Sequence, residues 1–397
     1  MNKLTVRDID VTGKRVLVRV DFNVPLDIKT GNISDDSRIR AVLPTIYYLI
    51  DNEAKIILCS HLGRPKGKVD ENMRLGVVAE RLSELLKKPV KSVKDCIGSE
   101  AKSAAENMDN GEVLLLENLR FYPEEEANDP GFAKALASLA DVYVNDAFGT
   151  AHRKHASVVG VTKYLPAVAG LLIEKEIQHL SGLMEDPGRP FGGLFGGSKV
   201  SDKVEMLENI MGNMDYLLIG GSMAATFLRA KGYETGKSYI EESCLEIASY
   251  LMGNAEKNEA ELFLPLDVVV VSAINEKAEG ETVDVESIPP DKIIVDMGLR
   301  TIEFFSKKLR GCKTIFWNGP MGISEIPQFA VATRAMAELL AETNAVTIVG
   351  GGSSAEVMTS MGLANKMTFI STGGGASLSF LGGQKLPGVE ALLDRED

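Results

Sequence analysis

Short, almost continuous apolar runs recur along the chain and are separated by stretches in which apolar residues have helical spacing. Four runs lie in the first half, at residues 16–21, 56–59, 113–116 and 142–144, and four in the second, at 194–195, 216–219, 314–317 and 346–349. Strands of a parallel sheet have this composition because helices cover both faces of the sheet. The pattern predicts an α/β fold built on parallel sheets.

The residues that follow these runs differ between the two halves of the chain. Early runs lead into polar groups that include Asp21, His61, Arg120 and Arg153, whereas the last run leads into the glycine cluster 350–352. Ligands of open parallel sheets bind beyond the carboxyl ends of the strands. We therefore expect two different half-sites for phosphate groups, one rich in arginine and one rich in glycine.

The chain has 397 residues, which is too long for one ordinary hydrophobic core, and two similar α/β domains fit it best. Between Pro166 and Pro187, apolar residues at 173, 177, 180 and 184 have helical spacing. We interpret this segment as a helix that joins two domains, because the chemistry of the strand ends changes across it. The alternative is an ordinary surface helix of one domain.

Composition narrows the classes of function. A net charge of −13 argues against nucleic-acid binding, which requires a basic face, so an anionic ligand must be held by local clusters of cations. The four cysteines lie far apart without C-x-x-C pairing, which predicts a reduced, cytoplasmic chain without disulfides or structural zinc. No stretch has the apolar length of a signal peptide or a membrane span, so we expect no membrane partner. Acidic runs such as 124–126 are expected to be solvated.

Arginines recur at or just past the predicted strand ends of the first half. Folding can gather several of them around one point, where guanidinium groups bind phosphate or carboxylate oxygens bidentately. His61 and residues 21–23 can add hydrogen bonds to the same ligand. Any single arginine can instead be a surface or ion-paired residue, so it is their repeated placement that favours a shared site. The set comprises Arg19, Arg38, Arg64, Arg120 and Arg153.

The glycine-rich segments of the second half suit a phosphate chain. Residues 196–203 (GGSKVSDK) follow a short strand, and the spacing predicts Lys199 and Lys203 on one helical face. Glycines allow the backbone to approach a ligand closely, and lysines supply mobile positive charge. The strand-then-glycine pattern recurs at 319–322, 350–354 and 370–377, the last resembling a strand that enters a helix with free N–H groups. A single turn of this kind can have purely steric causes.

Three local patterns do not support other chemistries. His152 and His155 have H-x-x-H spacing, but without an acidic residue between them or a third ligand nearby they argue against zinc. Residues 232–238 resemble a P-loop but have three residues between the glycines where four are needed. No G-x-G-x-x-G motif follows the first strand, which disfavours a dehydrogenase.

Seven motifs together resemble one enzyme family, the phosphoglycerate kinases, from end to end of the chain. They lie at residues 19–25 (RVDFNVP), 60–65 (SHLGRP), 116–121 (LENLRF), 146–153 (DAFGTAHR), 196–203 (GGSKVSDK), 317–322 (WNGPMG) and 371–375 (STGGG). The resemblance implies two doubly wound parallel-sheet, Rossmann-like domains joined by a helix, in an open, hinge-bending architecture. It places a phosphoglycerate-binding domain at 1–168, the helix at 169–186 and a nucleotide-binding domain at 187–380. The tail from about 381 to 397 is expected to pack back on the first domain.

The resemblance also implies an activity, the reversible in-line transfer of a phosphoryl group from 1,3-bisphosphoglycerate to ADP with magnesium, on domain closure. The products are 3-phosphoglycerate and ATP. Nothing in the sequence demands more than a monomer, which we take as the expected state. By motif match, the residues that would bind the phosphoglycerate are Asp21, Phe22, Asn23, Arg38, His61, Leu62, Gly63, Arg64, Arg120 and Arg153. Those that would surround the nucleotide are Gly196, Gly197, Lys203, Asn318, Glu325, Gly351, Gly352, Ser353 and Ser354, with Glu325 at the ribose. Those that would hold the phosphoryl group in flight are Arg38, Lys199, Gly373 and Gly374.

Two positions depart from the usual family pattern. Ser353 stands where the family usually has an aspartate that serves the nucleotide-bound magnesium, and a hydroxyl is a much poorer ligand than a carboxylate. We therefore expect no protein metal ligand and a magnesium ion held mainly by phosphate oxygens and water. Ser198 stands where alanine is usual, and we expect this change to be silent.

Two other functions remain open from the residues alone. One is a different two-domain small-molecule kinase, whose arginines recognise another phosphorylated acid. The other is a two-domain anion-binding protein that closes on its ligand without catalysis. The paired Lys199 and Lys203 and the absence of a signal peptide argue against the second.

Overall fold

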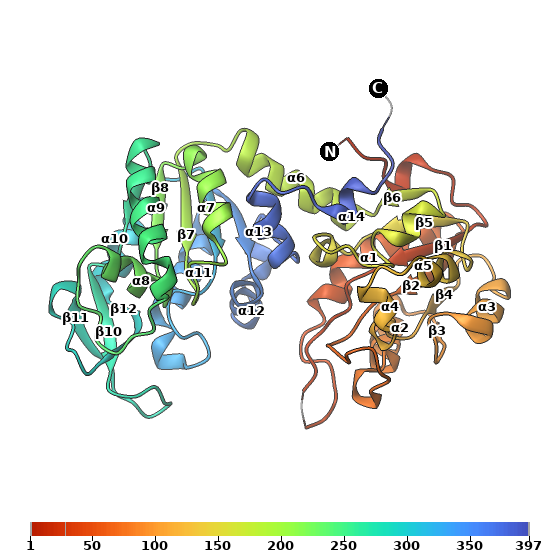
Figure 1. The fold of residues 1–397 in the computed structure, drawn as a ribbon, viewed down its shortest axis with the longest axis horizontal. Helices are drawn as coiled ribbons and strands as arrows, with labels where there is room; N and C mark the ends of the chain where they lie inside the picture. The colour runs from red at the N-terminus through yellow and green to blue at the C-terminus, as the bar shows by residue number, and fades with distance from the viewer. Residues whose placement is uncertain (1, 28, 396–397) are drawn as a thin grey trace. The chain divides into compact units, whose positions relative to one another are not determined.

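The computed structural model describes residues 2–27 and 29–395, and the chain divides into two compact units. The first contains the described residues up to 178 and those from 385 onward, and the second contains 179–384. Each unit is a layered α/β structure (Figure 1). The helix that the sequence predicts between Pro166 and Pro187 is α6 (Leu171–Glu185), which begins in the first unit and ends in the second. The expected boundaries lay at the two ends of this helix, whereas the compact units divide within it.

The first unit is built on a six-stranded sheet of order β3-β4-β2-β1-β5-β6, in which all neighbouring strands are parallel. Its strands are β1 (Arg15–Arg19), β2 (Lys55–Cys59), β3 (Val90–Ser92), β4 (Val113–Leu115), β5 (Val142–Asn145) and β6 (Ala167–Ala169). Its helices are α1 (Ser37–Asp51), α2 (Gly76–Leu86), α3 (Gly98–Glu106), α4 (Pro123–Glu126), α5 (Pro130–Ala137) and α14 (Pro387–Glu390).

Both faces of this sheet are covered. Val16 and Val18 of β1 belong to one core cluster with Ile39 and Val42 of α1. Leu17, which points to the opposite face, is also fully buried. This two-sided burial explains why the strands of the first unit are continuous apolar runs in the sequence.

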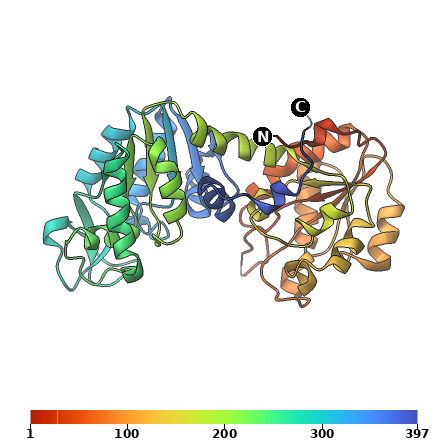
Figure 2. The same cartoon turned by 45° about the horizontal axis from the view of Figure 1, so that its top comes forward.

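The C-terminal segment packs on the first unit (Figure 2). The backbone N–H of Gly388 donates to the carbonyl of Ala151 at 2.8 Å, and Nδ2 of Asn145 donates to the carbonyl of Gly388 at 3.0 Å. Leu393 N–H donates to Ala167 O at 2.9 Å, which attaches the tail to β6. These bonds join residues more than 200 positions apart, so the unit includes both parts of the chain.

The second unit contains a second six-stranded parallel sheet, of order β15-β14-β13-β7-β8-β9. Its strands are β7 (Phe191–Phe195), β8 (Tyr216–Ile219), β9 (Glu261–Phe263), β13 (Thr314–Asn318), β14 (Val346–Gly350) and β15 (Phe369–Ile370). Its helices are α7 (Val204–Ile210), α8 (Met223–Ala230), α9 (Leu245–Lys257), α10 (Leu299–Leu309), α11 (Val331–Glu342), α12 (Gly352–Ser360) and α13 (Gly375–Leu381). All eight apolar runs of the sequence are confirmed as strands of the two parallel sheets.

Strand β7 begins earlier than the sequence predicted, because two glycines interrupt its apolar pattern. A Cβ atom on Gly193 would lie 2.4 Å from the ring of Phe195 and 2.6 Å from the sulfur of Met214. A Cβ on Gly192 would lie 2.9 Å from Sγ of Cys312. The glycines are therefore strand residues that leave room for neighbouring side chains.

A separate antiparallel sheet in the second unit was not predicted. It has the order β11-β10-β12, with strands β10 (Asp267–Val271), β11 (Glu281–Asp284) and β12 (Ile293–Met297). Strand β11 is largely exposed and polar, so its sequence lacks a clear period-two signal.

Three buried aspartates hold the first turns of helices. Asp146 accepts hydrogen bonds from the N–H groups of residues 172 and 173 at the start of α6. Asp267 accepts from residues 300 and 301 in α10, and Asp296 accepts from residue 332 in α11. Burial raises the pKa of Asp146 to about 7 and that of Asp296 to about 6. These carboxyl groups satisfy N–H groups that have no partner within their own helix.

Candidate functional site

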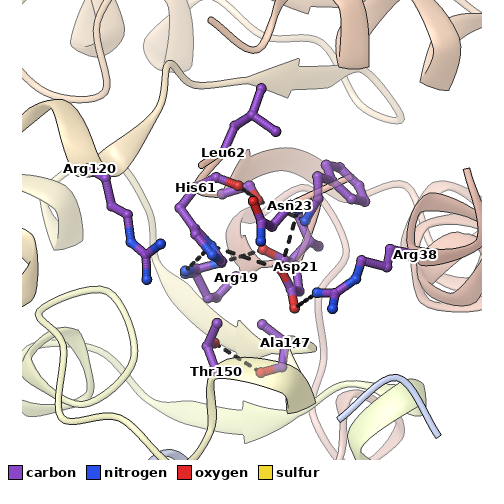
Figure 3. Close-up of polar contacts among 12 residues, drawn as sticks. Arg19, Asp21, Asn23, Arg38, His61, Leu62, Arg120, Ala147 and Thr150 are labelled. Carbon is purple, nitrogen blue, oxygen red and sulfur yellow. Dashed lines mark hydrogen bonds and ion pairs between the residues drawn. The ribbon is translucent and has the colours of Figure 1, made fainter. Parts of the chain in front are cut away.

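The polar residues that follow the strands of the first sheet lie close together at the carboxyl edge of that sheet (Figure 3). Asp21 follows β1 and His61 follows β2, and these strands are neighbours. The guanidinium of Arg38, in the first turn of α1, donates to Oδ2 of Asp21, and Nδ1 of His61 lies 3.9 Å from Oδ1 of the same carboxylate. Oδ1 of Asn23 accepts the N–H of Gly63 at 2.8 Å, which connects the β1 and β2 loops. The predicted neighbourhood of Asp21, Asn23, Arg38 and His61 is thus present.

Arg120 enters the same site from the loop after β4. Its Nη1 donates to the carbonyl of Gly63 at 2.8 Å, and its Nε lies 3.1 Å from Oε1 of Glu126. Oδ1 of Asn118 accepts the N–H groups of Arg120 and Leu62, at 3.1 and 3.2 Å. Asn118 therefore fixes the β2 and β4 loops to each other.

The remaining members of the arginine half-site differ in exposure. Arg153 is partly buried after β5, and its Nε lies 3.3 Å from Nε2 of His152, while Arg64 is exposed. Phe22 and Leu62 place their side chains in the hydrophobic core, so these two predicted residues offer only their backbone to a ligand. The structure thus brings Arg38, Arg120 and Arg153 to His61, whereas Arg64 is exposed and Phe22, Leu62 and Gly63 offer a ligand only their backbone.

His61 is held neutral in this site. Burial lowers its pKa well below the ordinary value, and the charges of Arg19, Arg120, Arg153 and Arg38 lower it further. Nη2 of Arg19 lies 3.1 Å from Nδ1 of His61. A guanidinium can only donate, so Nδ1 is the acceptor and the imidazole proton is on Nε2. His61 can therefore donate one hydrogen bond to an anion without carrying charge.

A buried carboxylate lies beneath the arginines, contrary to the expectation that the acidic run 124–126 is solvated. Glu125 is fully buried and accepts the N–H of Ser157 at 2.9 Å and its hydroxyl at 2.5 Å. The Ser157 hydroxyl in turn accepts from Nε of Arg19 at 2.8 Å. Burial raises the pKa of Glu125 and lowers that of nearby His155 to about 4. Local charge pattern cannot show this network, because its members are more than 30 residues apart.

The glycine-containing loops that follow strands β7 and β13 of the second unit contact each other directly. The N–H of Gly196 donates to the carbonyl of Asn318 at 3.0 Å, and that of Gly197 donates to the carbonyl of Pro320 at 2.8 Å. A Cβ on Gly196 would lie 2.1 Å from Pro320 O, and one on Gly319, whose φ is +94°, would lie 2.3 Å from Gly196 O. These positions require glycine for steric reasons as well as leaving the backbone accessible.

Gly221, which the sequence analysis omitted, completes this group after β8. Its φ is +63°, and its N–H donates to the carbonyl of Met321 at 3.0 Å. A signal was present, since Gly220 and Gly221 directly follow the apolar run 216–219. A small cavity beside Gly221 is lined mainly by apolar groups, which include Leu228, Val268, Val295, Met297 and Met321.

Lys199 and Lys203 do not lie on one helical face, which corrects the spacing argument. Both precede α7, in an irregular turn that ends at Lys203. Lys199 is exposed, whereas Lys203 is buried next to Gly197 and burial lowers its pKa. The helix begins later than the spacing suggested, so the two ammonium groups have different surroundings.

Asn318 and the loop after β14 form the adjacent part of the site. The amide nitrogen of Asn318 is buried and has no hydrogen-bond partner within residues 2–27 and 29–395. Gly351 has φ +90° and precedes α12, where Ser353 is exposed and the buried Ser354 hydroxyl accepts the N–H of Gly319 at 2.8 Å. The donor at Asn318 therefore lies beside the turn formed by Gly350 and Gly351, with its hydrogen-bonding capacity unused among the described residues.

The other predicted residues of this half lie at loop ends. Gly374 has φ +49° and precedes α13, and the N–H of Gly373 donates to the hydroxyl of Ser371 at 3.1 Å. Glu325 is exposed in the loop after β13. The predicted entry of a strand into a helix at 370–377 is confirmed by β15 and α13.

Comparison with known proteins shows the family to which this chain belongs. The family model described as phosphoglycerate kinase matches residues 6–384. A phosphoglycerate kinase of Dictyoglomus turgidum is 57% identical over 393 residues, covering 99% of this chain and 98% of that protein. The chain belongs to the phosphoglycerate kinase family. A second member, from Pelotomaculum thermopropionicum, is 54% identical over 395 residues and the full length of both chains.

Solved structures of phosphoglycerate kinases have the same fold. That of Coxiella burnetii superposes with a TM-score of 0.85 at 38% identity, and that of Pyrococcus horikoshii with 0.88 at 34% identity. Each alignment covers 98% of both chains. The predicted α/β class with two Rossmann-like parallel sheets is confirmed.

The four cysteines are buried free thiols, and burial raises the pKa of Cys59 to about 12 and that of Cys312 to about 11. In the described part of the chain, no three histidine, cysteine or acidic side chains are grouped to hold a metal ion. Within the same residues, none of the helices has the length and apolar character that crossing a bilayer requires.

Proposed function

We propose that this chain catalyses the reversible transfer of a phosphoryl group from 1,3-bisphosphoglycerate to ADP, giving 3-phosphoglycerate and ATP. The observation that carries the proposal is the convergence of Arg38, Arg120 and Arg153 on His61 in a chain of net charge −13. Such a cationic cluster fits a small, multiply charged acid. Family membership identifies that acid as a phosphoglycerate.

The first unit is proposed to bind the acid. Arg120, Arg153 and Arg64 supply charge to its phosphate, and Asp21 and Asn23 accept hydrogen bonds from its hydroxyl group. His61 donates from Nε2, because Arg19 occupies Nδ1. Backbone groups of residues 22, 62 and 63 complete the contacts.

The second unit is proposed to bind the nucleotide. The glycines at 196, 197 and 351–352 allow the phosphate chain to approach the backbone closely, while Lys203 and the unpaired amide of Asn318 supply donors. Glu325, which is exposed in the loop after β13, suits the ribose hydroxyls. Ser354 holds the Gly319 loop, and Ser353 lies at the start of α12.

Phosphoryl transfer requires positioning and charge stabilisation more than covalent participation by the protein. Arg38, Lys199 and the N–H groups of Gly373 and Gly374 are proposed to surround the transferring group. Because the acid and the nucleotide bind to different units, the reaction requires domain closure, which also protects the acyl phosphate from water.

Magnesium is proposed to enter with the nucleotide and to neutralise the charge of its phosphates. The donors of this chain fit an ion that keeps phosphate and water ligands, because the protein offers the hydroxyl of Ser353 rather than a carboxylate, and the Ser354 hydroxyl is already bonded to Gly319. A cytoplasmic monomer is the proposed working form.

A coupled assay tests the proposal and its nearest alternative, a kinase for another phosphorylated acid. The protein is supplied with ATP, varied magnesium and either 3-phosphoglycerate or another phospho-acid, and ADP release is followed. Turnover with 3-phosphoglycerate well above that with the other acids is expected. Faster turnover with another acid would show that this acid, and not 3-phosphoglycerate, is the substrate. Ligand binding without turnover would refute the kinase proposal.

A further inference from the structure

The turn between Lys199 and Lys203 is held by a carboxylate from a distant part of the chain. Oε2 of Glu241 accepts the N–H of Val200 at 2.8 Å and that of Ser201 at 3.1 Å. Oε1 of Glu241 accepts the Ser201 hydroxyl. One side chain therefore satisfies three donors in the irregular segment that carries both lysines.

Glu241 is itself anchored to the second unit. Its N–H donates to the hydroxyl of Thr226 at 3.2 Å, and its carbonyl accepts the N–H of Cys244 at 2.8 Å. Thr226, on α8, and Cys244 are both buried. Partial burial acts to raise the pKa of Glu241, but hydrogen bonds from Ser201 and Val200 outweigh it and hold that pKa below the ordinary value. The group is thus a carboxylate near neutral pH, with its charge satisfied by the turn.

Lys199 depends on this turn for its position. Its side chain is exposed and forms no hydrogen bond or ion pair with other residues in the described ranges 2–27 and 29–395. The backbone held at Val200 and Ser201 therefore fixes the point from which the Lys199 side chain leaves the main chain. A free turn would place Lys199 in many directions, and transition-state stabilisation requires one.

We propose that Glu241 is a positioning residue for phosphoryl transfer, which orients Lys199 and Lys203 by holding the backbone between them. The inference rests on the proposed function and extends it to a residue that does not touch the substrate. It also explains why an acidic side chain lies beside an anion-binding turn, since its oxygens are directed at backbone N–H groups.

Three variants of the full chain test this role in the coupled assay. Glu241→Ala removes the acceptor and should lower kcat about 10- to 100-fold and raise KM for ATP, with KM for 3-phosphoglycerate unchanged. Glu241→Gln should restore most of the activity, because its oxygen accepts the two N–H groups and its amide donates to the Ser201 hydroxyl. Glu242→Ala, at the exposed neighbouring residue, is the matched control and should behave like the unchanged protein.

A double mutant separates positioning from general destabilisation. If Glu241 supports kcat through Lys199, adding Glu241→Ala to Lys199→Ala should reduce kcat little further, while the rise in KM for ATP, which reflects Lys203, should persist. Independent, multiplicative losses would overturn the inference, as would Glu241→Ala kinetics equal to those of Glu242→Ala. Equal changes in both KM values with a lowered Tm would show a purely structural role. Absence of turnover by the unchanged protein would instead refute the proposed function, and this inference with it.

Discussion

Replacing Asp146 by asparagine should change how the stability of the first unit depends on pH. Asp146 follows β5, is fully buried, and accepts the N–H groups of Leu172 and Ile173 at 2.8 and 3.3 Å through Oδ1. Its Oδ2 has no hydrogen-bond partner in the described part of the chain. Burial raises the pKa of this carboxyl from 3.8 to about 7, although Thr45 and the two N–H groups act to lower it. The folded protein thus keeps a proton that the unfolded chain releases.

The sign and size of the effect follow from this difference. Below pH 4 the carboxyl is protonated in both states, and the unfolded chain ionises first as pH rises. The free energy of unfolding therefore falls between about pH 4 and pH 7 and becomes level above pH 7. About three pH units at ~1.4 kcal/mol each correspond to about 4 kcal/mol. Asp146→Asn keeps an oxygen acceptor for the N–H groups and removes the titration, so this component of the slope should disappear.

Urea unfolding at several pH values between 4.5 and 8 measures the slope. The single tryptophan, Trp317, is buried in the second unit, so its fluorescence follows that unit while circular dichroism follows both. Asp109→Asn, at an exposed position of the first unit, is the control. An unfavourable amide contact in Asp146→Asn would lower stability equally at every pH, so it would leave the slope test intact. Equal slopes for Asp146→Asn and the unchanged protein would refute the reasoning.

Three further predictions concern the nucleotide half. Lys199→Ala should lower kcat about 100-fold with KM values changed only a few-fold, because its role lies in the transition state; comparable losses of kcat and ATP affinity in steady-state kinetics would contradict this. Ser353→Asp should lower the magnesium concentration needed for half-maximal rate, and a magnesium titration that shows an unchanged or raised requirement would contradict it. Gly196→Ala places a methyl group 2.1 Å from Pro320 O and should cost about 2 kcal/mol in Trp317-monitored unfolding and weaken ATP binding by calorimetry. The neighbouring Ser198→Ala should change neither quantity, and equal behaviour of the two variants would disprove the steric argument.

Much of the fold and of the site chemistry could be predicted from local sequence. The eight apolar runs marked strands because burial on both faces leaves a continuous signal within four or five residues. The residues after them identified the arginine and glycine tips, since parallel strands bring their carboxyl ends to one edge. The same signal fails where glycines interrupt a buried strand, as in β7, and where a strand is exposed and polar, as in β11.

The tertiary structure decided which groups work together. Glu125 belongs to an acidic run and was expected in solvent, yet it is the buried partner of Ser157 beneath Arg19. Glu241 holds a turn 40 residues away, and Asp146 caps a helix 26 residues away. Lys199 and Lys203 lie in the turn that Glu241 holds, and not on the shared helical face that their spacing predicted.

The sequence by itself determined the class of fold and the residue types available to bind a phosphorylated acid and a nucleotide. Both follow from the composition of short segments of the chain, which does not depend on how those segments are arranged in space. Only the tertiary structure decided which carboxylates are buried, which imidazole nitrogen carries the proton and which backbone segments are held in place. Desolvation and hydrogen bonding depend on the neighbours that folding brings together. Because these neighbours are distant in the sequence, local sequence patterns do not reveal them.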